Sequence, residues 1–160
     1  VDKNTIDYYS RVLELAKTAD SAELSSLPIL DKFMVLTVKH RTPKEDILRY
    51  DGKGLLVYAI KSGMVGKSSV VNNTLGKIDV KGDSALAQLI VSSKPTPLHF
   101  TFHKESGNWK VDLTSIFPAS SEAFKKVVAQ SGKSDAEFFI ELLTNLTGTE
   151  PGPGIWHPLQ

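Results

Sequence analysis

Apolar residues recur at intervals of three and four positions near the N-terminus, and this spacing predicts an amphipathic helix over residues 2–19. Asp20 and Glu23 form a capping-box pattern, which predicts a short second helix directly after it. A third helix is expected to begin at Pro28, because the first turn of a helix does not use the amide donor that proline lacks. Residues 29–38 are apolar on more than one side of this helix, so we expect it to be buried.

Two more helical segments are predicted before the chain changes character. Residues 42–45, Thr-Pro-Lys-Glu, combine an N-cap threonine, a proline at the first helical position and a glutamate at the third. The helix that they start is expected to run to about Tyr50. It should be interrupted near residues 51–52 and then continue to a stop at Gly63.

Apolar and polar residues alternate through the middle of the chain, which is typical of strands. Four strands are expected, at residues 69–80, 84–92, 98–103 and 108–113. We expect a break in the first strand near Gly76, a turn at 81–83, a rigid proline-rich link at 94–97 and a hairpin tip at 105–107. Because the strands follow one another without helices between them, the sheet should be antiparallel.

Helical spacing returns after the strands. Ser120 or Ser121 is expected to cap a helix that ends at Gly132. A second capping box at residues 134–137 opens a last helix, which ends at Gly148. The sequence therefore predicts two helices after the sheet.

The order of these elements predicts one α+β domain over residues 1–148, with N-terminal helices packed on a curved antiparallel sheet of about four strands and two extra C-terminal helices. Residues 149–160 form a Pro/Gly-rich tail that carries Ile155, Trp156 and Leu159. We expect this tail to fold back and cover an apolar groove of its own domain. The alternative is a peptide that binds a partner, since Trp is common in binding hot spots.

Two segments resemble a known family. They are a helix over residues 6–16 that contains Asp7-Tyr8-Tyr9, and a hairpin over residues 100–113 that contains Trp109-Lys110-Val111-Asp112-Leu113. With the order of elements, they resemble the nuclear-transport-factor-two-like superfamily, the cystatin-like cone fold of ketosteroid isomerase and SnoaL-like cyclases. The resemblance covers about residues 4–115 and implies a bacterial member of that superfamily. The two C-terminal helices and the tail depart from the family pattern.

The resemblance also implies a ligand pocket between the helices and the apolar face of the sheet. Helix tyrosines would line its mouth and aromatic strand residues would form its wall. Gln88 could be a polar group inside it, although we favour a hydrogen-bonded core residue. The candidate pocket residues are Tyr9, Tyr50, Tyr58, Gln88, Phe100, Phe102 and Trp109. Enzymes of this fold place a carboxylate base and acidic donors in such a cavity, and the sequence offers no unambiguous pair of that kind.

A four-residue tip at 104–107 would separate the polar and apolar residues of the last hairpin onto two faces. On the polar face this register places His99 opposite Asp112, where the carboxylate could fix the imidazole tautomer for proton transfer. We favour an ordinary surface pair, so we assign no catalytic residue and keep His99 and Asp112 as candidates. His103 shares this face, but no third ligand is evident and no metal site is predicted.

Composition narrows the classes of function. The 160 residues carry 19 Lys+Arg and 18 Asp+Glu, a net charge of +1, so no nucleic-acid surface is predicted. The absence of cysteine excludes disulfides and thiolate chemistry. No apolar run approaches the ~18 residues of a membrane span. Residues 63–68 resemble a phosphate-binding loop, but Lys61 stands where the first glycine is required, so no nucleotide or other cofactor is predicted.

The sequence therefore predicts a non-catalytic domain that binds a small apolar ligand or a protein partner. One alternative is a small isomerase, hydratase or cyclase that acts on a carbonyl compound. Another is a structural module that forms a homodimer through the sheet face. The compartment is left open: the lack of cysteine and the first residue, Val1, favour export with a removed signal peptide slightly over the cytoplasm.

Overall fold

The structure is a computed structural model, and it describes residues 1–65 and 72–159. The helices of the first part are α1 (Lys3–Thr18), α2 (Ser21–Ser26), α3 (Ile29–Arg41), α4 (Lys44–Arg49) and α5 (Gly52–Lys61). The strands are β1 (Asn73–Lys81), β2 (Ser84–Val91), β3 (Lys94–Glu105) and β4 (Asn108–Asp112). The short 3-10 helix η1 (Leu113–Ile116) leads into α7 (Phe117–Ser131), and α8 (Asp135–Thr147) and η2 (Pro153–Trp156) follow.

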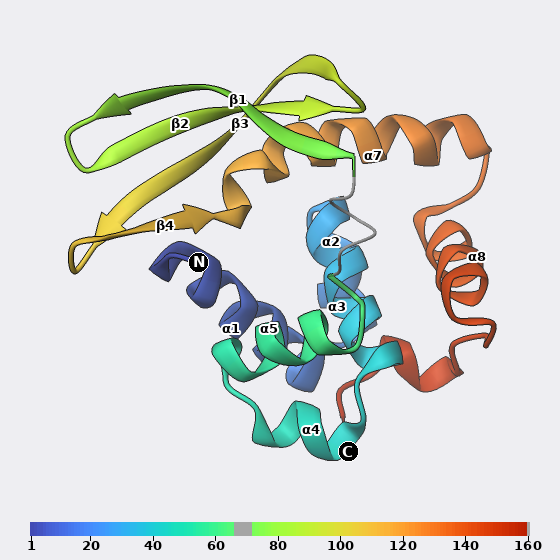
Figure 1. Cartoon of the computed structure of the whole chain (residues 1–160). Helices are drawn as coiled ribbons and strands as arrows, with labels where there is room; N and C mark the ends of the chain where they lie inside the picture. The colour runs from blue at the N-terminus through green and yellow to red at the C-terminus, as the bar shows by residue number, and fades with distance from the viewer. Residues whose placement is uncertain (66–71, 160) are drawn as a thin grey trace.

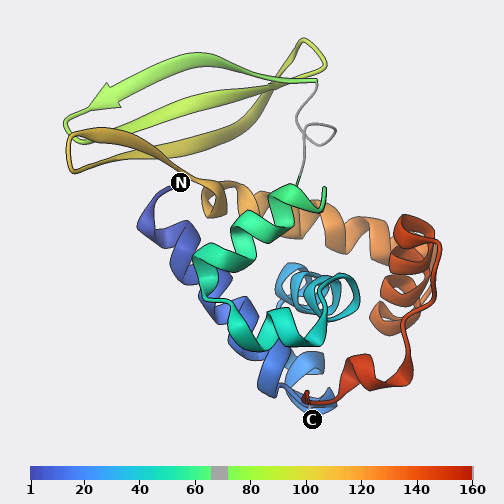
Figure 2. The ribbon, with the colours of Figure 1, turned by 60° about the horizontal axis from the view of Figure 1, so that its bottom comes forward.

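This order confirms the α+β fold class. The four strands form one open antiparallel sheet in the order β1-β2-β3-β4. The sheet lies beside the helices and extends beyond them on one side (Figure 1 and Figure 2). The predicted break near Gly76 is confirmed by a register shift between Leu75 and Ile78. The predicted beginning of the first strand, residues 69–71, and residues 66–68 of the loop-like motif lie outside the described residues.

Most helix starts follow local side-chain chemistry. Asp2, Asp20 and Asp51 each accept a hydrogen bond from the amide three residues further on, at the starts of α1, α2 and α5. Ser134 and Glu137 form a complete capping box at the start of α8. These caps confirm the predicted helices, including the interruption between α4 and α5.

One predicted cap belongs to a different helix end. Thr42 ends α3, where its amide donates to the Val38 carbonyl, and it does not cap α4. Pro43 keeps an extended backbone with ψ of 141°, so α4 begins one residue later than predicted and has no side-chain cap. The Thr42 hydroxyl therefore makes no cap hydrogen bond to α4.

The helix after the sheet begins earlier than predicted. Ser120 and Ser121 lie inside α7 and do not cap it. The reason is that Asp112 accepts a hydrogen bond from the Thr114 amide and starts η1, which continues directly into α7. The capping signal therefore lies in the last residue of β4.

The proline-rich residues 94–97 are the beginning of β3, which corrects the predicted link. The turn between β2 and β3 consists of Ser92 and Ser93, with φ of 49° and 63°. Two-residue hairpin turns of this kind usually contain Asn or Gly, so a serine pair carries little turn signal. The prolines fit because β4 pairs with β3 only from Thr101 onward, which leaves the first part of β3 with β2 alone.

The main core is formed by the helices and the tail. Its buried residues are Tyr9, Val12, Leu13, Ala16, Ala19, Leu24, Ile29, Val35, Leu36, Val38, Ile47, Leu55, Leu56, Val128, Phe139, Leu143 and Ile155. Trp156 and Leu159 of the tail pack against it. None of the described sheet residues belongs to this core or packs on it. Within the described residues, no helix is both long enough and apolar enough to cross a membrane.

Tyr8 connects α1 to α3 through a partly buried hydrogen bond. Because of this bond we expect the folded protein to lose stability at alkaline pH. Its hydroxyl donates to Asp31 Oδ1 at 3.0 Å, and Asp31 also pairs with Arg11 at 2.6 Å. Burial, together with the nearby Asp31 charge, raises the pKa of the Tyr8 hydroxyl far above its usual range. Folding therefore favours the protonated form, so this contribution is present below about pH 10 and is lost as the pH rises further.

We expect Tyr8→Phe to lower the free energy of unfolding by about 2 kcal/mol at neutral pH, because the Asp31 oxygen loses its donor. The variant should also lose less stability than the wild type between about pH 9 and about pH 11. Urea titrations at several pH values measure both effects. Parallel pH profiles for the two proteins would contradict the prediction.

Candidate functional site

One face of the sheet is apolar across all four strands. The register aligns Ala87 with Ile78 on one side and with Phe100 on the other, and Ala85 in the same way with Val80 and Phe102. Because opposite residues of an antiparallel pair share a face, these rows are continuous. We call this surface the apolar sheet face; its members are Leu75, Ile78, Val80, Ala85, Ala87, Leu89, Phe100, Phe102, Trp109 and Val111.

The two edge strands leave this face open to solvent. Leu75, Ile78 and Val80 of β1 are 47%, 55% and 61% exposed, and Trp109 of β4 is 43% exposed. Between them, Ala85, Ala87 and Leu89 of β2 are buried. Several exposed large apolar side chains on one continuous surface are typical of an interaction site.

The expectation that the apolar face meets the helices is wrong. The polar row of the sheet lies toward α1 instead: Asp112 accepts from Asn4, and His103 lies close to Asp2. The backbone is also joined there, since the Asp2 amide donates to the Val111 carbonyl at 2.9 Å. The helices complete a core among themselves, so the apolar row of the sheet is not needed to cover them.

The other face of β1 carries charge. Lys77 and Asp79 form an ion pair of 3.1 Å, and both side chains are more than half exposed. An exposed pair of this kind adds little to stability. In the described part of the chain β1 is an edge strand, so its outer backbone N–H and C=O groups are available to pair with a partner strand.

The register of the last hairpin differs from the predicted one by two residues. The tip is Ser106-Gly107, with φ of 50° and 79°, and Thr101 lies opposite Asp112. A shift of two keeps every side chain on its predicted face but changes its partner. His99 is therefore not beside Asp112; it is exposed, pairs with Gln88, and places Nδ1 3.0 Å from the Pro97 carbonyl.

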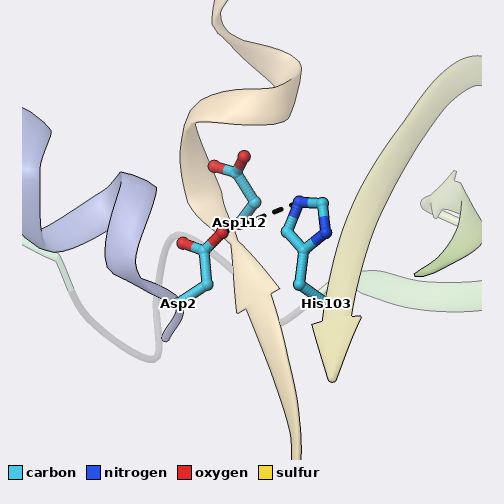
Figure 3. Close-up of side chains that lie close together, drawn as sticks. All are labelled: Asp2, His103 and Asp112. Carbon is cyan, nitrogen blue, oxygen red and sulfur yellow. Dashed lines mark ion pairs between the residues drawn. The ribbon is translucent and has the colours of Figure 1, made fainter. Parts of the chain in front are cut away.

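His103 takes the place that the prediction gave to His99. Its ring points toward the carboxylates of Asp2 and Asp112 (Figure 3). One ligand atom from each of the three residues lies within 4.8 Å of the other two, and His103 Nε2 is 3.8 Å from Asp2 Oδ2. The sequence could not indicate this cluster, because Asp2 is about a hundred residues away from the hairpin.

Local hydrogen bonds hold the Asp112 carboxylate in place. Oδ1 accepts from the Thr114 amide at 2.8 Å and its hydroxyl at 2.6 Å, and Oδ2 accepts from Asn4 at 3.1 Å. Burial acts to raise the pKa of Asp112, but these hydrogen bonds, with His103 nearby, outweigh burial and lower the pKa below its usual value. Asp112 is therefore kept as an anion at neutral pH.

The predicted pocket residues do not line one cavity. Tyr9 is buried in the main core. Tyr50 and Tyr58 pack together with ring centroids 5.7 Å apart and line a cleft of about 420 Å³ on α5. Gln88 donates to the Thr96 carbonyl within the sheet. The remaining three, Phe100, Phe102 and Trp109, lie on the apolar sheet face.

The tail creates a cleft that the sequence did not indicate. A space of about 490 Å³ lies between the end of α3 and the tail, lined by Lys39, His40, Pro151, Gly152, Gly154, Ile155 and residues 157–159. The Lys39 ammonium donates to the His157 carbonyl, and burial lowers the pKa of Lys39. This contact holds the tail against α3, and the Leu159 amide fixes it further by donating to the Lys17 carbonyl at 2.9 Å.

No protein-family model, curated protein or solved structure matches this chain.

Proposed function

We propose that this protein is a non-catalytic binding module that docks a protein partner on its apolar sheet face. The observation that carries the proposal is the exposure of Leu75, Ile78, Val80 and Trp109 on one continuous surface. Covering side chains of this size contributes on the order of 1–2 kcal/mol each. A flat surface of that width suits a polypeptide better than a small ligand, which binds best in a concave pocket.

The partner that fits β1 best is a second copy of the same chain. If two β1 strands paired antiparallel about a two-fold axis at Ile78, Lys77 would lie opposite Asp79 of the second copy, and Asp79 opposite its Lys77. Both cross-strand pairs would then be of opposite charge, which favours this register. This pairing would set Ile78 of one copy beside Ile78 of the other on the apolar sheet face, so each would cover part of the other's exposed side chain.

The first test is the oligomeric state in solution. Sedimentation or light scattering over a dilution series should show a monomer–dimer equilibrium for the wild type. Ile78→Glu should raise the dissociation constant at least about tenfold, because it places two carboxylates at the centre of the interface. The matched control is Leu48→Glu, since Leu48 of α4 is 54% exposed and lies away from the sheet. A wild-type chain that stays monomeric at the highest concentration would contradict the homodimer.

A charge exchange tests the register itself. Lys77→Glu alone should weaken the dimer, because it places like charges opposite each other in both cross-strand pairs. The double exchange Lys77→Asp with Asp79→Lys should restore it, since opposite charges then face each other again. The folded monomer should change little, because both side chains are exposed. Equal dissociation constants for the single and the double variant would exclude this pairing.

If the wild type is monomeric and Ile78→Glu changes nothing measurable, the apolar sheet face remains without the predicted partner. A cross-linking experiment with photoreactive groups at Val80 and at Leu48 then distinguishes a different protein partner from the absence of any partner on this face. Specific cross-links from Val80 to one other protein would support a heterologous partner, and equal labelling from both positions would overturn the proposed function.

A further inference from the structure

We propose that Asp2, His103 and Asp112 form a binding site for a divalent transition-metal ion such as Zn²⁺. The three residues come from the beginning of α1, from β3 and from the end of β4. They offer two carboxylate oxygens and one imidazole nitrogen, all within 4.8 Å of one another. Figure 3 shows the three side chains converging from these separate elements. This site is independent of the apolar sheet face.

One carboxylate oxygen of Asp2 is buried and belongs to the cluster. Asp2 is 1% exposed, and its Oδ1 accepts from the Thr5 amide. Its Oδ2 is buried and has no hydrogen-bond partner among the described residues, although it faces the cluster. A buried carboxylate oxygen without a donor is costly, so a cation bound at this point would satisfy it.

The separation between Asp2 and His103 fits a shared ion better than a direct hydrogen bond. Oδ2 and Nε2 are 3.8 Å apart, whereas a hydrogen bond between nitrogen and oxygen measures about 2.7–3.2 Å. Zinc lies about 2.0–2.2 Å from each nitrogen or oxygen ligand, so two of its ligands stand roughly 3–4 Å apart. The observed spacing therefore leaves room for an ion between the two atoms.

Neighbouring groups hold the ligands in the required orientation. Thr114 and Asn4 donate to Asp112, and the Thr5 amide donates to Asp2. Such outer contacts orient the ligands of a metal site before the ion binds. The His103 side chain is 35% exposed, which gives an ion and its remaining water ligands a route from solvent.

The donor set defines the class of ion. One imidazole with two carboxylates suits Zn²⁺, Mn²⁺ or Co²⁺. Mg²⁺ and Ca²⁺ prefer oxygen ligands alone, so they should bind more weakly. Because the ligands lie on α1, β3 and β4, the bound ion would join the beginning of the helical body to the sheet.

The test is calorimetric titration of the full chain with ZnCl₂ after removal of metals with a chelator. We expect one saturable site, and a thermal midpoint that rises with Zn²⁺ and falls back when chelator is added. Mg²⁺ should compete poorly. The absence of saturable Zn²⁺ binding by the wild type would overturn the proposal.

Two variants and a matched control assign the site. His103→Gln and Asp2→Asn should each weaken Zn²⁺ binding at least about tenfold, and Asn preserves the helix cap because it caps as well as Asp. His99→Gln is the control: His99 lies on the same strand and is exposed, but is outside the cluster. Equal affinity in the wild type and His103→Gln would place the ion elsewhere and overturn the proposal.

A measurement on the wild type avoids any question of whether the variants fold. Substoichiometric Mn²⁺ broadens the NMR signals of the nuclei closest to it. The imidazole signals of His103 should broaden first, before those of His99, His40 and His157. If another histidine broadens first, the proposed ligand set is wrong.

Discussion

Phe139→Ala should lower the free energy of unfolding by about 3–5 kcal/mol, the largest loss we expect from a single substitution in this chain. Phe139 lies on α8 and is fully buried. Its ring stacks on Phe33 of α3 with centroids 5.6 Å apart, and it lies 5.7 Å from the ring of Phe124 on α7. Truncation would therefore leave a cavity where three helices meet, and aromatic neighbours of this size cannot close it fully.

Phe138→Ala is the matched control for this cavity. Phe138 precedes Phe139 on the same helix, but it is only partly buried and contacts Phe139 and Phe124 edge-on. We expect a smaller loss, because part of its ring already faces solvent, whereas Phe139 is fully buried. Chemical denaturation of both variants measures the difference. A loss for Phe138→Ala that equals or exceeds that for Phe139→Ala would contradict the packing described here.

The same experiment bears on how the C-terminal helices relate to the rest of the chain. If α7 and α8 share one core with α1 and α3, Phe139→Ala should shift a single cooperative transition. A second transition that appears only in the variant would mean that the C-terminal helices unfold separately.

Local signals explain why much of the fold could be predicted. The caps at Asp20 and Ser134 act within three residues, so the sequence alone indicates them. The alternation of polar and apolar residues assigned the faces of β3 and β4 correctly, even though the register was displaced by two. That displacement came from the tip, where Ser106-Gly107 makes a shorter turn than the four residues expected.

The sites depended on contacts that local patterns do not encode. His103 and His99 lie on the same face of β3, and only the true register decides which of them approaches Asp112. Asp2 reaches the pair because the beginning of α1 hydrogen-bonds to the Val111 carbonyl. No periodicity near residue 2 indicates a partner so far along the chain.

The apolar sheet face was predicted as a pattern but given the wrong surroundings. The alternation in a strand shows that one of its faces is apolar. It does not show what covers that face. The expected cover was the helices, on the basis of the family resemblance. Instead the helices and the tail bury their apolar residues against one another, and Ile78 and Val80 remain more than half exposed. The proposed partner surface and the helical core are therefore two separate uses of apolar residues.

Gly52→Ala should destabilise the protein by about 3 kcal/mol, because α5 crosses α1 at this residue with no space for a methyl group. A Cβ atom at Gly52 would overlap Ser10 Oγ and lie 2.6 Å from both the Ile6 carbonyl oxygen and the Ser10 amide nitrogen. The last two atoms belong to the backbone of α1, so they cannot move aside by a side-chain rotation. The whole of α5 would have to shift, and Leu55 and Leu56 in the core would shift with it.

Gly54→Ala, two residues further along the same helix, is the matched control. The three atoms nearest to a Cβ atom there belong to the side chains of Asp51 and Tyr50 and lie 3.2 Å or more away. Alanine also favours the helical conformation over glycine by roughly 0.5–1 kcal/mol, so this variant should be neutral or slightly more stable. Thermal and urea unfolding should therefore separate the two substitutions by several kcal/mol. Equal stabilities would mean that α1 and α5 do not approach each other as closely as Gly52 allows.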